Sequence, residues 1–413
     1  MKILLTSDWF VPAVNGVVVS FMNLYRELKK QGHDVKILTL SKSDDSYIDG
    51  DFYFVRSFGI KVYPDVRATF AFNSRILNEL IDWKPDIIHS QCEFFTYTFA
   101  YRIAKKTGVP IVHTYHTLYE YYTQYVIPNK KLGKAMVSKI MRYRLKNAET
   151  VIAPTKKVKN TLLSYELNDN LVIIPTGIDL SRYNKVVSKE RKDEIRSSLN
   201  IPEDNKILIN IGRVAEEKNL KELVDNFGML LQVYDKVNFV IVGDGPYMSE
   251  LKEYVQSKKL MGKIIFTGMI NPDEVVDYYQ TGDIFISASV SETQGLTYVE
   301  ALANCLPEVC REDEAIDEVI ENGYNGFTYK NEAEFIEYAK KLLTDDEMRA
   351  EFSRNAKESS EKFSKENFGL SVYKVYEDTI KRFNPDKYKV DLQDMIKNIK
   401  IKSQRLINWN KDE

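Results

Sequence analysis

Two acidic residues, Glu292 and Glu300, are separated by seven residues in a segment that predicts a loop followed by a helix beginning near Gly295. The first amides of such a helix lack partners within the helix and lie at the positive end of its dipole, where phosphate oxygens bind. A carboxylate can accept hydrogen bonds from two hydroxyl groups at once. Two carboxylates flanking a phosphate site therefore suit a ligand with a hydroxylated ring at each end of a diphosphate, which is a sugar nucleotide.

A second segment carries two cations that match this site. Arg213 and Lys218 stand five residues apart after an apolar run at 207–211, where a strand is expected to pass into a helix. Together they can supply two positive charges to one diphosphate. Either segment alone also fits a capped loop, an exposed helix glutamate or solvated surface charge. Their combination in one chain favours the sugar-nucleotide interpretation.

Length and composition indicate an ordinary globular chain. With 413 residues and 44% hydrophobic content, the chain is long enough for two domains that each bury a core. Three cysteines without paired spacing predict free thiols in a reducing compartment, hence a cytoplasmic protein. The short apolar run at the N-terminus predicts a buried strand instead of a signal peptide, and no stretch approaches the roughly 20 apolar residues of a membrane-spanning helix.

Short apolar runs alternate with amphipathic segments, which is typical of parallel sheets covered by helices. A polar stretch at 188–200 separates two such series and predicts two sheets. Strands are expected at residues 3–5, 35–38, 52–55, 86–89, 111–113, 151–153 and 172–174, then at 207–211, 238–242, 263–266, 284–287 and 326–329. Helices are expected at 24–31, 130–146, 221–233, 274–280 and 332–343. A Gly-x-Gly turn at Gly243 and Gly245 lacks the third glycine of the dinucleotide fingerprint and does not favour a dehydrogenase.

These motifs, in this order, resemble the retaining GT-B glycosyltransferases of family four. The matching segments cover nearly the whole chain: Gly16, Thr-Tyr-His-Thr at 114–117, Ile-Pro-Thr-Gly-Ile-Asp at 174–179, Gly-Arg-x4-Lys at 212–218, Val-Gly-Asp-Gly-Pro at 242–246 and Glu-x7-Glu at 292–300. The resemblance implies an α/β fold of two Rossmann-like, doubly wound domains that face each other across a cleft. The expected parts are an N-terminal domain at 1–187, a nucleotide-sugar domain at 188–365, a helix at 366–385 that crosses back, and a basic amphipathic tail at 386–413.

The resemblance also implies a role for individual residues. Arg213 and Lys218 would bind the donor diphosphate and neutralise the leaving group without a metal or other cofactor. Glu300 would hold the ribose, Glu292 the transferred sugar, and His116 would contact that sugar near its reacting centre. The expected catalytic residues are His116, Arg213, Lys218 and Glu292, and the expected donor-binding residues are Gly16, Arg213, Lys218, Ile270, Glu292, Gln294, Gly295, Leu296, Thr297 and Glu300.

Two of these expectations depend on the resemblance most directly. On composition alone a single histidine is more often structural, and His113 and His33 keep that interpretation. Glycine at position 16 would let the backbone approach the phosphates, because any side chain there would intrude.

Similar enzymes lack a carboxylate nucleophile beneath the anomeric carbon, so the expected mechanism is front-face attack, with the leaving phosphate oxygen accepting the proton of the acceptor.

A basic amphipathic segment points to the acceptor. Between residues 128 and 146 there are seven cations and no acid, interleaved with apolar residues: Lys130, Lys131, Lys134, Lys139, Arg142, Arg144 and Lys146. This composition is typical of a helix in an anionic membrane interface, although a core-facing helix with solvated lysines also fits. The N-terminal part of the chain is the more basic one, since residues 1–180 carry 24 Lys and Arg against 17 Asp and Glu, whereas residues 181–413 carry 34 against 43.

The amino-acid sequence of the motif at 291–298 resembles that of the lipid-modifying branch of the family, the bacterial 1,2-diacylglycerol 3-glucosyltransferases. This implies transfer of α-glucose from UDP-glucose to the 3-hydroxyl of diacylglycerol by a cytoplasmic protein on the inner face of the cell membrane. The alternatives are a transferase of the same fold with a soluble acceptor, a sugar-nucleotide epimerase, and a nucleic-acid-binding protein that uses the basic half. The acidic second half and the lack of an Arg/aromatic array argue against nucleic acid.

One residue departs from the family pattern. After Glu300 the family usually has an apolar strand, where this chain has Glu308. A glutamate at the start of a buried strand is costly unless it is paired. The sequence offers no partner for it, so we expect a local packing defect more than a change in donor binding.

Overall fold

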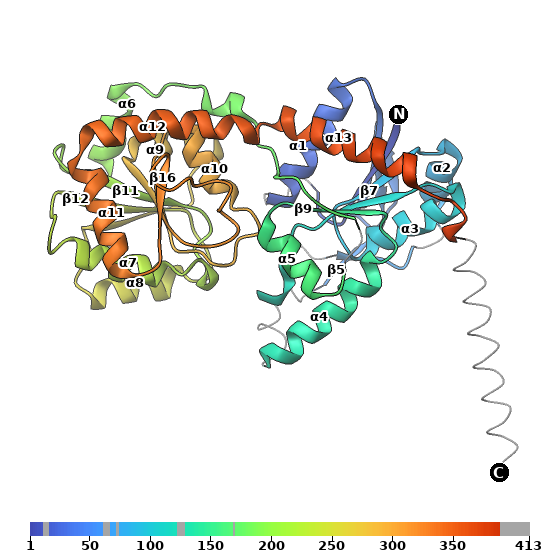
Figure 1. Ribbon diagram of the computed structural model, residues 1–413, viewed down its shortest axis with the longest axis horizontal. Helices are drawn as coiled ribbons and strands as arrows, with labels where there is room; N and C mark the ends of the chain where they lie inside the picture. Colours follow the sequence, from blue (N-terminus) through green and yellow to red (C-terminus); the bar gives the residue numbers. More distant parts are fainter. Residues whose placement is uncertain (11–15, 61–66, 72–73, 122–128, 168–169, 389–413) are drawn as a thin grey trace, which may run out of the picture.

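Two parallel sheets form the centres of two lobes that lie side by side (Figure 1). The computed structural model describes residues 1–10, 16–60, 67–71, 74–121, 129–167 and 170–388. The expected pair of doubly wound α/β domains is confirmed. The C-terminal helix α13, Lys365–Arg382, returns to the N-terminal lobe and packs on α1, Gly16–Lys30, as expected.

The N-terminal sheet has eight strands in the order β10-β9-β8-β7-β1-β2-β4-β3, and only β3 is antiparallel to its neighbour. Its central strands are buried on both faces, with Ile3 and Leu4 of β1 in separate apolar clusters. Burial on both faces explains why these strands are apolar without alternation. The strands are β1 Lys2–Ser7, β2 Asp34–Leu40, β3 Tyr47–Asp49, β4 Phe52–Val55, β7 Ile87–Ser90, β8 Ile111–Thr114, β9 Thr150–Ala153 and β10 Leu171–Ile173, beside a small hairpin of β5 Phe58–Gly59 and β6 Arg67–Ala68.

The C-terminal sheet has six parallel strands in the order β13-β12-β11-β14-β15-β16. Strands β11 and β14 are neighbours although two strands lie between them in the sequence, so the winding reverses there. Ligands of such sheets bind beyond the carboxyl ends of the strands at this reversal. The strands are β11 Lys206–Ile211, β12 Val237–Val242, β13 Ile264–Gly268, β14 Ile284–Ser287, β15 Glu308–Arg311 and β16 Gly326–Tyr329.

Helices cover both faces of the two sheets (Figure 1). The remaining α-helices are α2 Arg75–Trp83, α3 Phe95–Thr107, α4 Lys130–Leu145, α5 Lys156–Ser164, α6 Lys189–Ser198, α7 Leu220–Leu230, α8 Met248–Ser257, α9 Val275–Thr281, α10 Leu296–Ala303, α11 Glu332–Thr344 and α12 Asp346–Ser360. Short 3-10 turns lie at Tyr119–Tyr121, Leu180–Tyr183, Glu216–Lys218, Pro272–Glu274 and Glu361–Phe363.

Two helices differ from the sequence-based expectation. The polar stretch at 188–200, expected only as the break between the two series, forms α6, which Arg191 ties to Asp277 of α9 by an ion pair of 3.0 Å. Helix α1 begins at Gly16 instead of residue 24, although its first turns are rich in valine. Burial of Val18 and Phe21 outweighs the weak helix preference of the β-branched residues.

The two domains are joined by two crossing segments that pair with each other. The amide of Ile178 donates to the carbonyl of Phe363 at 2.8 Å, and the amide of Lys365 donates to the carbonyl of Ile178 at 2.9 Å. A β-carbon on Gly177 would lie 2.6 Å from the carbonyl oxygen of Ser364 and 2.6 Å from Phe368 Cβ. Glycine is therefore required at 177 because the two segments approach so closely.

We predict that Gly177→Ala lowers the free energy of unfolding by roughly 1–3 kcal/mol, because the crossing segments must move apart to accept the methyl group. Urea denaturation of both proteins measures this change. Gly59→Ala is the matched control, since a β-carbon there would meet no atom within 4 Å. Equal midpoints for the two variants would contradict the role of Gly177.

The chain after α13 continues along the N-terminal domain as far as the structure describes it. Tyr388 is buried and donates its hydroxyl proton to the carbonyl of Val109 at 2.9 Å. Lys387 pairs with Glu149 at 3.0 Å. The start of the predicted tail therefore packs on the first domain, whereas residues 389–413 lie outside the described residues.

Candidate active site

The two predicted donor segments meet beyond the carboxyl ends of β11 and β14. Lys218 Nζ lies 2.5 Å from Glu292 Oε1, and Ser291 Oγ donates to the carbonyl of Glu217 at 3.2 Å. The two segments are 74 residues apart in the chain. The sheet brings them together because β11 and β14 pair directly and each segment follows its strand.

Arg213 belongs to the same segment as Lys218 and pairs with Glu217. The backbone around Arg213 is held by the glycine-rich turn after β12. A β-carbon on Gly243 would lie 2.0 Å from the carbonyl oxygen of Gly212, and one on Gly245 would lie 2.2 Å from that of Val214. The two glycines of this turn therefore allow a close backbone contact that places Arg213, which is a structural role and not dinucleotide binding.

The two glutamates of the motif have different environments. Burial raises the pKa of the Glu292 carboxyl, but the charge and hydrogen bond of Lys218 outweigh burial, so its pKa lies below the ordinary value. Burial dominates at Glu300 and raises its pKa, although Tyr279 donates a hydrogen bond of 3.0 Å to Oε2. Glu292 is thus a carboxylate that can accept hydrogen bonds from hydroxyl groups. Glu300 is held in place by a tyrosine that the sequence did not single out.

Helix α10 begins at the predicted position, and its start faces the N-terminal domain. Gly295 has a φ of 73° and precedes the helix. A β-carbon on Gly16, the first residue of α1, would lie 3.6 Å from Leu296 Cδ1. Likewise, a β-carbon on Gly212 would lie 4.0 Å from Thr297 Cγ2. The predicted residues Gly16, Leu296 and Thr297 therefore border the same space as the Arg213 segment.

Gln294 has a different environment from the one that its neighbours suggest. Its side chain is buried and forms two hydrogen bonds with the backbone of Thr176, at 2.6 Å to the amide and 2.9 Å to the carbonyl. Thr176 belongs to the segment that joins the two domains. The Gln294 side chain therefore binds the loop to this joining segment, which we call the hinge. Only the backbone of Gln294 is left to contact the donor as predicted.

Ile270, predicted to bind the donor, lies in the segment that follows β13. Gly268 has a φ of 70°, and the amide of Gly243 donates to its carbonyl at 3.0 Å. Ile270 packs against the apolar cluster that contains Tyr298 of α10. The segment therefore contacts both the turn after β12 and the cluster of α10, and a role of Ile270 in donor binding stays a prediction.

His116 lies in the N-terminal domain, just after β8, and is partly buried. Its Nε2 lies 2.7 Å from Gln91 Oε1. An amide oxygen only accepts, so the Nε2 atom carries the proton. Burial, helped by the neighbouring His113, lowers the pKa of His116 to about 3. His116 is therefore neutral near pH 7, and Gln91, which the sequence did not single out, sets its tautomer.

His113 precedes His116 by three residues and lies within β8 itself. His113 is fully buried in β8, where its Nε2 lies 3.1 Å from Glu93 Oε1. Tyr119 donates its hydroxyl proton to the second oxygen of Glu93 at 2.6 Å. This pairing satisfies a buried carboxylate beneath the N-terminal side of the site.

The seven cations predicted to face a membrane are not equivalent in the structure. Three of them contact protein groups: Lys134 with Glu120 at 3.5 Å, Arg142 with Glu166 at 2.6 Å, and Arg144 with Thr98 at 2.9 Å. Lys139 and Lys146 are exposed, and the Nζ of Lys146 lies over the ring of Tyr143, 5.1 Å from its centroid. The side chains of Lys130 and Lys131 lie outside the described residues.

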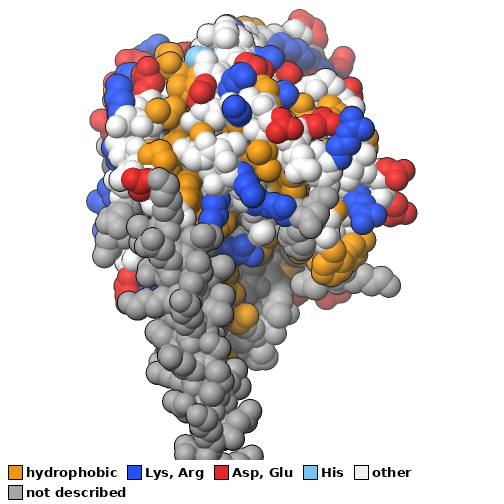
Figure 2. Space-filling view, turned by 90° about the vertical axis from the view of Figure 1, so that its right-hand side faces the viewer, with side chains coloured by type: hydrophobic (Ala, Val, Ile, Leu, Met, Phe, Trp, Pro, Cys, Tyr) orange, Lys and Arg blue, Asp and Glu red, His pale blue; other side chains and the backbone are white. Residues whose placement is uncertain are grey.

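Helix α4 carries two apolar stripes instead of one. Val137, Met141 and Leu145 are buried in the core of the N-terminal domain. A second stripe is exposed and consists of Leu132, Met136, Ile140 and Tyr143, with Leu132 61% and Tyr143 67% exposed. The core-facing alternative therefore accounts for one stripe only. On the outer end of the same domain, by contrast, acidic and basic side chains are interspersed (Figure 2).

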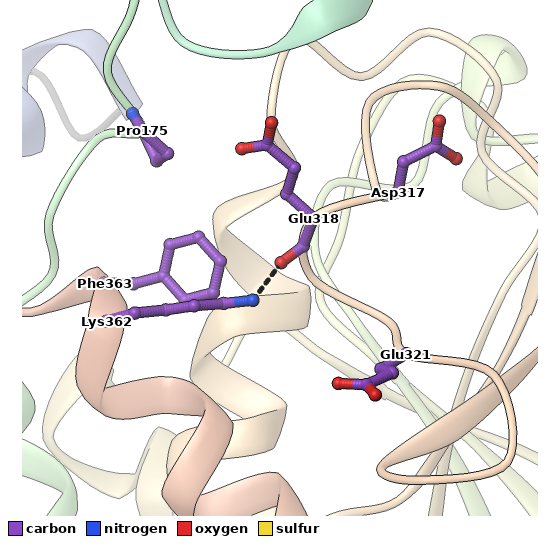
Figure 3. A pocket seen from close by; sticks show the side chains of 6 residues that line it. All are labelled: Pro175, Asp317, Glu318, Glu321, Lys362 and Phe363. Carbon is purple, nitrogen blue, oxygen red and sulfur yellow. Dashed lines mark hydrogen bonds between the residues drawn. The ribbon is translucent and has the colours of Figure 1, made fainter.

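A pocket of about 460 Å³ lies at the hinge, away from the residues of the predicted donor site. Three carboxylates, of Asp317, Glu318 and Glu321, and one ammonium group, of Lys362, surround it (Figure 3). Lys362 Nζ donates to the carbonyl of Glu318. This excess of negative charge does not suit a diphosphate.

None of the described helices has the length and apolar character needed to span a membrane. Within the same part of the chain, no three or more His, Cys, Asp and Glu side chains are arranged to hold a metal ion.

Comparison with known proteins agrees with this geometry. The model of "Glycosyltransferase Family 4" matches residues 14–182, and that of "Glycosyl transferases group 1" matches residues 191–359. The alpha-monoglucosyldiacylglycerol synthase of Streptococcus pneumoniae is 35% identical over 92% of this chain and 86% of its own length. The enzyme of the same name from Acholeplasma laidlawii is 32% identical over 93% of this chain and 98% of its own length.

Solved structures show the same fold at low sequence identity. HepE of Anabaena in complex with UDP and glucose has a TM-score of 0.70 at 16% identity and covers 92% of this chain and 100% of its own. Sucrose-phosphate synthase of Thermosynechococcus elongatus has a TM-score of 0.72 at 18% identity, over 91% of this chain and 98% of its own. Both family models, two relatives above 30% identity and the GT-B architecture lead to one conclusion: the chain belongs to glycosyltransferase family 4 and is a retaining hexosyltransferase.

Proposed function

We propose that this protein transfers glucose from UDP-glucose, with retention of configuration, to the 3-hydroxyl of diacylglycerol on an anionic membrane surface. The observation that carries the donor half of the proposal is that the segment with Arg213 and Lys218 meets the loop with Glu292, through the Lys218–Glu292 pair, just before the start of α10. The acceptor half is supported by the exposed apolar stripe of α4 and by the names of the two relatives above 30% identity.

The leaving group would be stabilised by positive charge that is already in place. Lys218 is paired with Glu292 and Arg213 with Glu217, so both side chains are held by an ion pair before the donor arrives. Groups that need no rearrangement stabilise developing charge more strongly than mobile ones. The Arg213 and Lys218 cations and the amides at the start of α10 would hold the diphosphate without a metal or other cofactor. Glu292 would accept hydrogen bonds from hydroxyls of the hexose, and Glu300 from those of the ribose.

The attacking hydroxyl of the acceptor would be deprotonated without help from His116, which is neutral. A histidine with a pKa of about 3 is not a proton acceptor at neutral pH, so it would bind the hexose through hydrogen bonds. The leaving phosphate oxygen would then take the proton of the attacking hydroxyl on the same face. Catalysis of this kind depends on positioning and on stabilising the departing diphosphate.

A transferase of the same fold with a soluble acceptor is the remaining alternative. The family assignment favours a transferase over the sugar-nucleotide epimerase and over the nucleic-acid-binding protein. The exposed stripe on α4 supports the lipid acceptor, because a soluble substrate gives no reason for four large apolar side chains to face water along one helix.

Incubation with radiolabelled UDP-glucose, UDP-galactose or GDP-mannose tests both halves together. The protein is mixed with vesicles of phosphatidylglycerol and diacylglycerol, and the lipids are then extracted. We expect label in the lipid fraction with UDP-glucose only, as an α-glucoside by NMR, and little product in vesicles of phosphatidylcholine. Label confined to water-soluble products would end the lipid proposal.

The exposed stripe of α4 provides a second, independent prediction. The triple change Leu132→Ser, Met136→Ser and Ile140→Ser should weaken binding to phosphatidylglycerol vesicles at least about tenfold, because each buried methylene contributes about 0.8 kcal/mol. Co-sedimentation with vesicles measures this binding. UDP binding should not change, since the stripe belongs to the N-terminal domain and the nucleotide to the other.

The control for this variant removes exposed apolar side chains from the C-terminal domain. Met229→Ser with Val233→Ser changes two residues of comparable exposure, 38% and 50%. Vesicle binding should remain as in the wild type. A loss that is equal in the two variants would show that general surface hydrophobicity, and not α4, determines the affinity.

A further inference from the structure

Residues of the N-terminal domain hold the loop that carries Glu292. We call residues 290–294 the donor loop. Lys157, in the first turn of α5, donates from Nζ to the carbonyl of Val290 at 2.6 Å. Thr155, which caps the same helix, donates from Oγ1 to the carbonyl of Thr293 at 2.8 Å. Two carbonyls that flank Glu292 are therefore bound by one helix start of the opposite domain.

An ion pair reinforces this contact. Lys157 Nζ lies 2.9 and 2.7 Å from the two carboxylate oxygens of Asp313, which follows β15. The two side chains are only 13% and 10% exposed. Removal of one member of a pair this shielded leaves the other as a poorly solvated charge, so the pair holds the domains together more firmly than a surface contact does.

A third contact fixes the end of the loop. Gln294 is bound through its side chain to the backbone of Thr176 in the hinge. Within the C-terminal domain the loop is attached at Ser291, which donates to the carbonyl of Glu217, and at Glu292 itself, which pairs with Lys218. The donor loop thus lies between the two domains, and its position depends on both.

We propose that Lys157, through its ion pair with Asp313 and its hydrogen bond to Val290, is a positioning residue that seats Glu292 when the two domains close. This inference rests on the proposed function, because it assigns Glu292 to the hexose of the donor. Closure would place the sugar-binding carboxylate only when α5 reaches the donor loop. Binding of the hexose and approach of the N-terminal domain are then one event.

The binding test uses two ligands that differ by the hexose. We expect Lys157→Met, which keeps the length and apolar stem of the side chain, to weaken binding of UDP-glucose at least about tenfold and binding of UDP less than about twofold. Calorimetric titration measures both. A variant that merely loses stability would change the two affinities together, and this result would overturn the proposal, as would unchanged affinity for UDP-glucose.

The partner residue is tested by a double-mutant cycle. If Lys157 and Asp313 act as one unit, Asp313→Asn should cause a similar loss, and the double variant should be no worse than the poorer single variant. Fully additive losses would overturn the assignment. Asn160→Ala is the matched control, since Asn160 donates to Glu314 across the same interface at 3.0 Å without touching the donor loop. It should leave the affinity for UDP-glucose unchanged.

A measurement without ligand separates this inference from the proposed function. In Lys157→Met, the backbone amides of the donor loop should exchange hydrogen at least about tenfold faster than in the wild type, whereas those of Asn160→Ala should not. Unchanged exchange would overturn the positioning role whatever the substrate. A wild-type protein that binds no UDP-sugar, together with faster exchange in the variant, would overturn the proposed donor and leave the positioning of the loop in place.

Discussion

Alanine at Lys218 or at Arg213 is expected to lower kcat by at least about 100-fold, which corresponds to about 2.7 kcal/mol of the barrier. Both cations belong to the segment that is proposed to bind the leaving diphosphate, and each is held by a glutamate partner, Glu217 for Arg213 and Glu292 for Lys218. The charge on the departing group is largest in the transition state, so its stabilisation should affect kcat more than donor affinity. Steady-state rates with saturating UDP-glucose and diacylglycerol vesicles check this expectation.

A neighbouring lysine provides the control for this experiment. Lys221 lies one turn further along and pairs with Glu250 at 2.8 Å on the surface of the C-terminal domain. Lys221→Ala should keep kcat within about twofold of the wild type, because surface ion pairs contribute little. Near-normal kcat in both Lys218→Ala and Arg213→Ala would remove the leaving-group role from the proposed mechanism.

Replacement of Glu308 is expected to stabilise the protein and to change how stability depends on pH. Glu308 is fully buried at the start of β15, and neither carboxyl oxygen has a hydrogen-bond partner among the described residues. Burial raises its pKa well above the ordinary value. The predicted loss of stability from this residue has a structural basis. Glu308 lies on the same face of the strand as Cys310, two residues further along, and this face packs in an apolar cluster.

The sign of the pH effect follows from the raised pKa. Below about pH 4.5 the carboxyl is protonated in both the folded and the unfolded protein. Between that pH and the higher folded pKa, only the unfolded protein releases the proton. The free energy of unfolding should therefore fall as pH rises through this window, by up to roughly 1 kcal/mol per pH unit from this group. Urea denaturation between pH 5 and pH 8 checks this trend.

Two substitutions separate the charge from the polarity of the side chain. Glu308→Gln cannot ionise, so it should remove this part of the pH dependence while leaving an unsatisfied polar group. Glu308→Met should remove the pH dependence and also raise the free energy of unfolding by about 1–3 kcal/mol, because no polar group remains buried. If the stability of the wild type and that of Glu308→Gln depended on pH in the same way, the raised pKa of Glu308 would be wrong.

The sequence predicted the elements of the fold well, because each carries its own periodicity. Strands buried on both faces read as apolar runs, as at residues 284–287, and helices such as α11 show their spacing along the chain. The start of α10 at Leu296 followed from Gly295 and the motif around it. Local patterns were less reliable for α6, whose polar residues face partners on α9 that only the folded chain supplies.

The chemistry of the donor site was also readable, since cations and carboxylates with fixed spacing indicate a charged, hydroxylated ligand. The ordered set of motifs identified the family, which the comparisons confirm. The roles of the single residues in binding the donor remain predictions. So does the membrane role of the seven basic residues, because three of them contact protein groups that are distant from them in the sequence.

The sequence by itself determined which residue types the protein has for binding a sugar nucleotide and on which elements they stand. Only the tertiary structure decided which of them meet. The pairing of β11 with β14 brings Lys218 to Glu292. The contact between the domains brings Lys157 to the carbonyl of Val290 and the side chain of Gln294 to the backbone of Thr176. The physical reason is that periodicity and motif spacing are local properties of a chain, whereas hydrogen bonds, burial and pKa values depend on neighbours that folding brings from distant positions.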